Sequence, residues 1–188
     1  MLPNNVSKKE IIMAFFDIMG SSQRIASGQL EAVYNFYDYM AKLCAKEDVP
    51  LATRAILPEE KGTEIVCLYP MKHAFFSDTF ILWVEDDSFF EPRFGGFYEW
   101  CIRIFIEATK RGIPLRGAIS RGQAIMDDEN KIYLGEPLVE AAKLESMQSW
   151  LGITLGLSCR MVQPSEVFCL LPYHKHLKQE VSGIPKEN

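Results

Sequence analysis

An apolar run spans residues 11–16 and is followed directly by Asp17 and then by a turn at Gly20. A continuous run of this length predicts a strand over residues 11–18 that is buried on both faces and ends in a loop. A carboxylate at the end of such a strand loses hydration, so it requires either a cation or hydrogen-bond donors from the following turn. On this stretch alone, the turn donors are the simpler interpretation of Asp17.

A second pattern changes that interpretation. Residues 73–84 form two short strand-like runs separated by a polar break, which predicts a hairpin with Asp78 at its tip. If this hairpin lies beside the first strand, Asp17 and Asp78 converge. Two carboxylates in a partly dry site repel each other, and the usual relief is one raised pKa or a divalent cation. The two patterns together therefore favour a metal site.

Helical spacing of apolar residues predicts three helices, over residues 23–47 with an interruption near Gly28, over 89–111 and over 135–147. Further strands are predicted over residues 63–68, 115–126, 131–134 and 150–157. The order of strand, helix, hairpin, helix and strand is the βαββαβ order of a ferredoxin-like core. We therefore expect an α+β fold with one mixed or antiparallel sheet covered by helices and extended at its C-terminal end.

Composition limits the classes of protein and partner. The 188 residues show no linker, so we expect one domain, with a core over about residues 10–158 and a C-terminal extension over 159–188. The net charge of −5, without a dense Lys/Arg cluster, disfavours polymeric nucleic acid but permits a single nucleotide. The polar first ten residues and the short apolar run after them predict neither a secretory signal nor a membrane span. A cytoplasmic protein is expected.

The thiol and imidazole groups show no clear catalytic pattern. The cysteines are odd in number and form no CxxC pair, which is typical of free thiols in a reducing compartment. They are Cys44, Cys67, Cys101, Cys159 and Cys169. The His174 and His176 pair is interpreted as part of a solvated tail rather than as a metal site. The acidic turn at residues 127–130 is likewise interpreted as a solvated turn.

The turn after the first strand has two interpretations. Free backbone N–H groups at residues 20–22, at the start of a helix, attract phosphate oxygens, and the glycine permits close approach. The alternative is ordinary helix capping by Ser21 or Ser22.

Three blocks, in this order along the chain, resemble the class III nucleotidyl cyclases. The family's first metal-binding Asp lies at a Phe-x-Asp-Ile-x-Gly strand end, matched by Phe15–Gly20, and its second lies at a hairpin tip, matched by Phe76–Thr79. A Gly-containing strand and a Gly-led helix are matched by Arg116–Gly122 and by residues 135–146. The resemblance covers about residues 11–157.

Four positions depart from the purine cyclases of this family. Ala74 and Ile132 stand where polar base-selecting residues are usual, and Val139 and Lys143 replace the usual transition-state Asn and Arg. These departures resemble the compact bacterial pyrimidine cyclases of Pycsar antiphage defence, which make cyclic UMP or cyclic CMP. UTP is favoured over CTP only because most such cyclases are expected to use it. A purine cyclase and a catalytically degenerate sensing or dimerisation module are the alternatives.

The resemblance implies a homodimer with sites between the subunits, two Mn²⁺ or Mg²⁺ ions, a nucleoside triphosphate substrate and a downstream effector protein activated by the cyclic nucleotide. The implied metal ligands are Asp17, Asp78 and the Ile18 carbonyl. Phosphates would lie on the backbone of Met19, Gly20 and Ser21, and Phe15 and Ala74 complete the nucleotide site. Negative charge that develops during cyclisation requires a cation. The candidates for this cation are Arg116, Arg121 and Lys143, each of which is otherwise interpreted as a surface charge.

Overall fold

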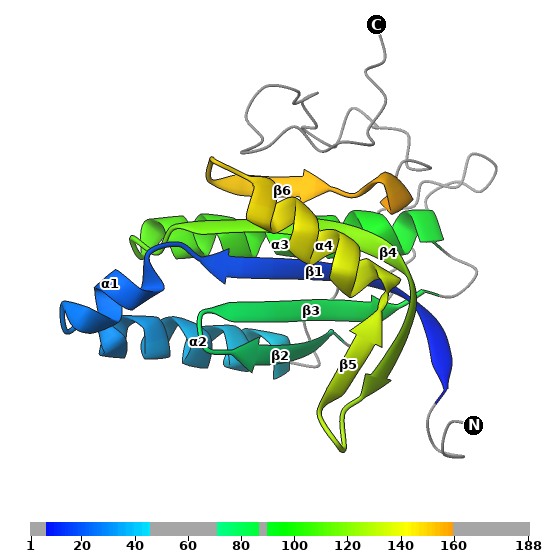
Figure 1. The fold of residues 1–188 in the computed structure, drawn as a ribbon, viewed down its shortest axis with the longest axis horizontal. Helices are drawn as coiled ribbons and strands as arrows, with labels where there is room; N and C mark the ends of the chain where they lie inside the picture. Colours follow the sequence, from blue (N-terminus) through cyan, green and yellow to red (C-terminus); the bar gives the residue numbers. More distant parts are fainter. Residues whose placement is uncertain (1–6, 46–70, 87–89, 160–188) are drawn as a thin grey trace, which may run out of the picture.

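The computed structural model describes residues 7–45, 71–86 and 90–159 (Figure 1). These residues form an α+β fold with a six-strand mixed sheet and four helices. In chain order the elements are β1 (Lys8–Ile18), α1 (Ser21–Ala26), α2 (Leu30–Ala45), β2 (Lys72–Phe76), β3 (Thr79–Glu85), α3 (Phe90–Lys110), β4 (Leu115–Asp127), β5 (Ile132–Gly135), α4 (Glu136–Met147), β6 (Gly152–Leu155) and a 3₁₀ turn at Leu157–Cys159.

The strand order is β2-β3-β1-β4-β5, with β1 at the centre, and each of these neighbouring pairs is antiparallel. β4 is long enough to have two different neighbours beyond β1. Its first half pairs in parallel with β6, and its last four residues pair with β5. The mixed sheet therefore arises from the short β6, and the ends of β1 and β4 meet where Asp17 lies opposite Arg116.

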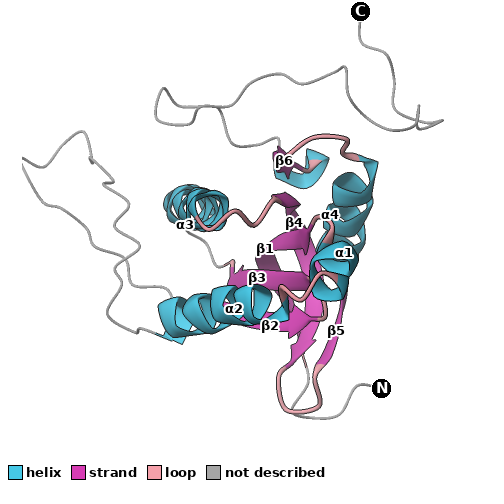
Figure 2. Ribbon diagram, turned by 90° about the vertical axis from the view of Figure 1, so that its left-hand side faces the viewer, coloured by secondary structure: helices cyan, strands magenta, loops and turns pink. Residues whose placement is uncertain are grey.

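Helices cover both faces of the sheet. α2 and α3 lie on one face, and α4 lies on the other (Figure 2). Alternate β1 residues follow this division, because Ile12, Ala14 and Phe16 belong to the larger cluster packed with α2 and α3, whereas Ile11 and Met13 belong to a smaller cluster. All five are fully buried. The prediction that this strand is buried on both faces is confirmed.

Most predicted elements within the described residues are present. Gly28, at φ +81°, separates α1 from α2, which confirms the predicted interruption of the first helical stretch. The hairpin turns at Ser77 and Asp78, as predicted. The last strand is shorter than expected, because residues 157–159 form a 3₁₀ turn instead. The strand predicted over residues 63–68 lies outside the described residues.

Three of the cysteines fall within the described residues, and all three are free thiols. Cys101 and Cys159 are buried, and Cys44 is partly buried. Cys67 and Cys169 lie outside the described residues, as do His174 and His176. Among the helices that the structure describes, none is sufficiently long and apolar to cross a membrane.

Candidate functional site

Strand pairing brings Asp17 and Asp78 to the same end of the sheet. Asp17 is the last residue of β1 to pair with β3, and its partner there is Thr79, the residue after Asp78. The Ile18 N–H donates a hydrogen bond of 2.8 Å to the Asp78 carbonyl, which fastens the hairpin turn to the end of β1. Two acids that lie 61 positions apart in the sequence are thus neighbours through the backbone.

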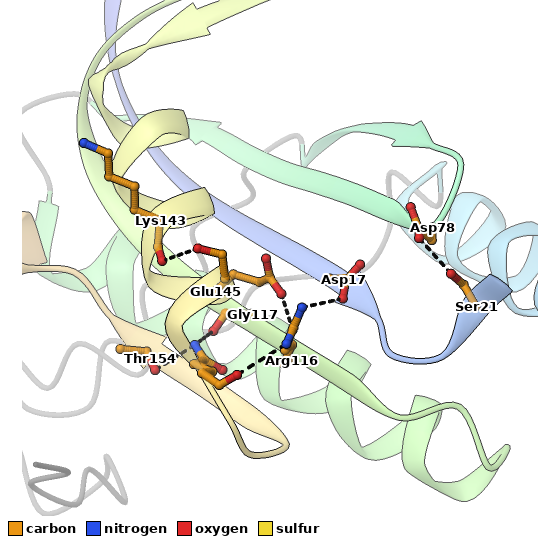
Figure 3. A network of polar contacts seen from close by, with 10 residues as sticks. Asp17, Ser21, Asp78, Arg116, Gly117, Lys143, Glu145 and Thr154 are labelled. Carbon is orange, nitrogen blue, oxygen red and sulfur yellow. Dashed lines mark hydrogen bonds and ion pairs between the residues drawn. The ribbon is translucent and has the colours of Figure 1, made fainter. Parts of the chain in front are cut away.

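Asp78 is held by the start of α1. The Ser21 hydroxyl donates to Asp78 Oδ2 at 2.7 Å, and Ser21 is only 4% exposed (Figure 3). Gly20 is the N-cap residue, at φ +70°, a left-handed conformation that glycine adopts without strain. Capping by Ser21 or Ser22 is therefore wrong, since α1 has no side-chain cap and the Ser21 hydroxyl is directed to the hairpin acid instead.

Fewer backbone N–H groups are available to a phosphate at residues 19–21 than expected. The Met19 N–H donates to the Pro114 carbonyl at 2.9 Å, so it is already engaged. The Ile18 N–H is likewise engaged, by Asp78. Of the three positions that the resemblance implies, Gly20 and Ser21 are thus left for phosphate contact through their backbone N–H groups.

Arg116 links Asp17 to two groups of the helix α4 region. Arg116 Nη2 lies 3.2 Å from Asp17 Oδ2, and Arg116 Nε forms a very short ion pair with Glu145 (Figure 3). A third nitrogen, Nη1, donates to the Gln148 carbonyl at 3.3 Å. The Arg116, Asp17 and Glu145 side chains are 16%, 18% and 8% exposed, so this is a largely desolvated charge network. Of the predicted cations, Arg116 is the one that the structure brings to the acids.

Glu145 and Gln148 were not identified from the sequence. The apolar spacing of residues 135–147 predicts that Leu138, Ala141, Ala142 and Leu144 supply the buried side of this helix. Ala141 is buried as predicted, but the other buried positions are Pro137 and Glu145. Gln148, which is 0% exposed, donates from Nε2 to the Gly117 carbonyl at 2.6 Å and to Thr154 Oγ1 at 2.8 Å. These bonds join the end of α4 to β4 and β6, close to Arg116.

The structure does not bring Arg121 or Lys143 to the acids of the same chain. Arg121 pairs with Ile12 of β1. It lies five positions after Arg116, the residue that pairs with Asp17, so its side chain is on the opposite face of the sheet. Its Nε lies 2.5 Å from the fully buried Asp86 carboxylate. Lys143 is exposed on α4, and its amino group points away from Asp17 and Arg116 (Figure 3).

Phe15 and Ala74 lie on the face of the sheet that carries Asp17. Ala74 pairs with Ile81, Ile81 pairs with Phe15, and Phe15 pairs with Ala118, which gives one lateral row of four side chains across β2, β3, β1 and β4. Neither Phe15 nor Ala74 is fully buried. All four residues are apolar, so this row offers no polar side chain at the position to which the resemblance assigns base selection.

Tyr37 of α2 lies within the electrostatic reach of both acids. Burial raises the pKa of its phenol well above the usual range, and the charges of Asp78 and Asp17 raise that pKa further. The hydroxyl oxygen is buried and has no hydrogen-bond partner in the part of the chain that is described. Tyr37 also packs against Phe75, with the ring centroids 4.8 Å apart, so its ring supports the hairpin that carries Asp78.

The charge balance of the site suits a hard divalent cation. Among the described interactions, Asp17 and Glu145 share the guanidinium of Arg116, and Asp78 accepts a hydrogen bond from the neutral Ser21 hydroxyl. Within the described ranges no group of three or more His, Cys, Asp or Glu side chains forms a complete metal cage. Mg²⁺ is commonly held by only one or two carboxylates together with substrate phosphates, so Asp17 and Asp78 fit an ion that arrives with a nucleotide.

Comparison of the sequence with models of known protein families gives no match, and neither does comparison with curated proteins. The interpretation of the site therefore depends on its geometry and on the motif resemblance.

Proposed function

We propose that this protein is a nucleotidyl cyclase that converts a pyrimidine nucleoside triphosphate, UTP in preference to CTP, into the 3′,5′-cyclic nucleotide and pyrophosphate. The observation that supports this most directly is the meeting of Asp17 and Asp78 at one end of the sheet. They are the two positions that resemble the metal-binding acids of class III cyclases.

The connectivity of the sheet supports the same proposal. β1, the α1–α2 pair, β2, β3, α3 and β4 follow one another in βαββαβ order, and their strands are arranged as β2-β3-β1-β4. Each helical connection thus joins two strands that have a third strand between them, which is the arrangement of a ferredoxin-like core. β5, α4 and β6 would then be the C-terminal extension of the cyclase type.

The proposed reaction is an in-line phosphoryl transfer. The ribose 3′-oxygen bonds to the α-phosphorus, the bond from this phosphorus to the bridging oxygen of the pyrophosphate breaks, and the 3′-hydroxyl proton is lost. Positioning and charge neutralisation supply most of the catalysis in such transfers. Two Mn²⁺ or Mg²⁺ ions, when bound, would lower the pKa of the attacking hydroxyl and neutralise the leaving oxygens.

The residues of this chain have separate roles in that reaction. Asp17 and Asp78, with the Ile18 carbonyl, would hold the cations, and Ser21 orients Asp78. Arg116, which already faces Asp17, would bind phosphate oxygens whose charge increases as pyrophosphate leaves. Phe15 and Ala74 would form the apolar part of the nucleotide site.

A homodimer accounts for Lys143. Its amino group points away from the acids of its own chain, so it would serve a site only across an interface (Figure 3). We propose that α4 of one subunit presents Lys143 to the acids of the other. In this proposal the protein acts in the cytoplasm, in bacterial antiphage defence, and its cyclic product activates an effector protein.

One observation favours a second candidate, a degenerate cyclase-like module that senses nucleotides or dimerises without turnover. Arg116 already supplies Asp17 with a cation, so the carboxylate is stabilised without a metal ion. Asp78, in contrast, has no ion pair among the described interactions and is oriented by a neutral hydroxyl. The cyclase assignment explains both acids, whereas the degenerate module explains only Asp17.

Product identification tests the proposal. The purified protein would be incubated with ATP, GTP, CTP and UTP in the presence of Mn²⁺, and the products would be identified by mass. Cyclic UMP or cyclic CMP is the expected product. Cyclic AMP alone would show that the inference from Ala74 and Ile132 is wrong.

Matched variants connect the activity to the site. Asp17→Asn and Asp78→Asn should each abolish cyclisation while the protein remains folded. Asp128→Asn is the control, because Asp128 is a partly exposed acid at the β4–β5 turn and pairs only with Lys72 among the described ion pairs. Turnover retained by both site variants would refute the proposed site.

A further inference from the structure

Glu145 is the least exposed ionisable group of the site, and no motif of the sequence assigned it a role. Its side chain is 8% exposed, and it forms a very short ion pair with Arg116 Nε. A buried carboxylate requires a counter-charge, and here that counter-charge comes from the same guanidinium that contacts Asp17. Arg116 is thus shared between two carboxylates on different elements, β1 and α4.

Different nitrogens of the Arg116 guanidinium contact the α4 region and Asp17. Nε forms the ion pair with Glu145 and Nη1 donates to the Gln148 carbonyl, both in the α4 region, while Nη2 lies 3.2 Å from Asp17 Oδ2. The contact with Asp17 is the longer of the two ion pairs. Arg116 therefore has two partners in the α4 region and one in Asp17. The contact with Asp17 can be lost while Glu145 and the Gln148 carbonyl still hold the guanidinium in place.

We propose that Glu145 is a positioning residue that anchors Arg116 and draws its charge from Asp17, so that a divalent cation can replace Arg116 on Asp17 while Arg116 stays at the site. This inference rests on the proposed function, since it assumes that Asp17 and Asp78 bind divalent cations. Without Glu145, Arg116 would pair with Asp17 alone and would compete directly with the cation. Arg116 is in this sense the internal counter-ion of Asp17, and Glu145 sets how tightly it is held there.

Binding of Mn²⁺ to the nucleotide-free protein tests this role without any turnover. The free Mn²⁺ signal in electron paramagnetic resonance gives the Kd of the wild type, of Glu145→Gln and of Glu140→Gln. Glu140 is the matched control, because it is a partly buried carboxylate of the same helix that bonds Ser158 instead of Arg116. Glu145→Gln should raise the Kd by about 10- to 100-fold, as is typical when an outer partner of a metal ligand is lost. Glu140→Gln should leave it unchanged.

A charge-balanced double variant distinguishes positioning from a purely structural role. Glu145→Gln combined with Arg116→Gln removes the anchor together with the competing cation, so Mn²⁺ affinity should return to the wild-type value or become tighter. If Glu145 only supported the packing of α4, the second substitution would destabilise the protein further and Mn²⁺ binding would stay weak. The double variant also decides the case if Glu145→Gln alone does not fold, because it leaves no unpaired charge between β4 and α4.

The outcomes separate the two proposals. Wild-type Mn²⁺ binding with no change in Glu145→Gln, or a double variant that binds more weakly than the wild type, would overturn the positioning role and leave the proposed function intact. A wild type that binds no Mn²⁺ but forms a cyclic nucleotide would overturn the positioning role alone, and one that does neither would overturn both proposals. Circular dichroism and the elution volume would confirm that each variant compared is folded.

Discussion

Two phenylalanines that flank the turn carrying Asp78 should differ sharply in their contribution to stability. Phe80 follows the turn in β3 and is fully buried, whereas Phe76 precedes it in β2 and is 44% exposed. We predict that Phe80→Ala lowers the free energy of unfolding far more than Phe76→Ala. The comparison keeps the residue type, the substitution and the distance from Asp78 nearly constant.

The magnitude follows from the packing of Phe80. Its ring stacks on Phe16 with centroids 5.0 Å apart, and the rings of Tyr37, Phe36 and Phe75 lie at 5.9, 6.1 and 6.1 Å. Removing a fully buried Phe side chain costs about 3–5 kcal/mol, because the apolar burial is lost and a cavity remains. Small domains are stable by about 5–15 kcal/mol, so this change alone removes a large fraction of the stability.

Phe76 should cost much less. Its described aromatic contact is with Tyr133, at 5.9 Å between centroids, and nearly half of its surface is already in water. An aromatic pair of this kind contributes about 1 kcal/mol. Urea unfolding, followed by tryptophan fluorescence and fitted with a common m value, gives both free energies. A difference of less than about 1 kcal/mol between the two variants would refute the proposed core around Phe80.

Three further predictions test other parts of the structure. Gly117→Ala should lower the free energy of unfolding in urea by about 1–3 kcal/mol. The added Cβ would lie 2.6 Å from both the Phe15 carbonyl oxygen and Phe16 Cδ1, and an unchanged free energy would contradict this crowding. Tyr37→Phe should leave stability unchanged or raise it by up to about 1 kcal/mol, because the buried hydroxyl has no described partner, and a clear loss would reveal a bond to that hydroxyl. Burial lowers the pKa of His73, although the charge of Asp128 opposes this shift. The unfolded chain therefore binds more protons than the folded one, and the free energy of unfolding should fall as the pH drops through about 6.5. His73→Gln should flatten this part of the pH profile of stability, and an identical slope in the variant would exclude His73 as its source.

The positions of Asp17 and Asp78 could be predicted because the signals are local. A continuous apolar run ending in an acid, and two short runs broken by a polar pair, each define an element and place its acid at a terminus. The pairing of β1 with β3 then requires only the strand order of a βαββαβ core. The break at Gly28 is local in the same way, since its left-handed backbone at φ +81° favours glycine.

The separation of Arg121 from the face that carries Asp17 follows from the sequence. Arg116 and Arg121 are five positions apart on one strand, and successive side chains alternate between faces, so an odd separation places the two on opposite faces. Only one of them was able to share the face of Asp17. Register decides which one, and the register follows from the pairing of Asp17 with Arg116.

Glu145 was beyond sequence reasoning for a different reason. The apolar residues of α4 indicated a buried face, and an acid at such a position is normally assigned to solvent because burying an unpaired carboxylate is costly. Its partner, Arg116, lies 29 positions earlier on a strand, and no periodicity relates a helix to a strand across that distance. Only the packing of α4 on β4 reveals that the two charges neutralise each other.

The difference between the partners of the three acids is the strongest physical reason to prefer a cyclase to a degenerate module. Asp17 and Glu145 share one guanidinium, and Asp78 adds a further carboxylate whose partner is a neutral hydroxyl. Such an arrangement reduces the stability of the protein when no ion is bound, because like charges repel in a partly dry site. A module that only dimerises gains nothing in return. An enzyme that receives its cations together with a triphosphate, in contrast, uses both Asp17 and Asp78 as ligands.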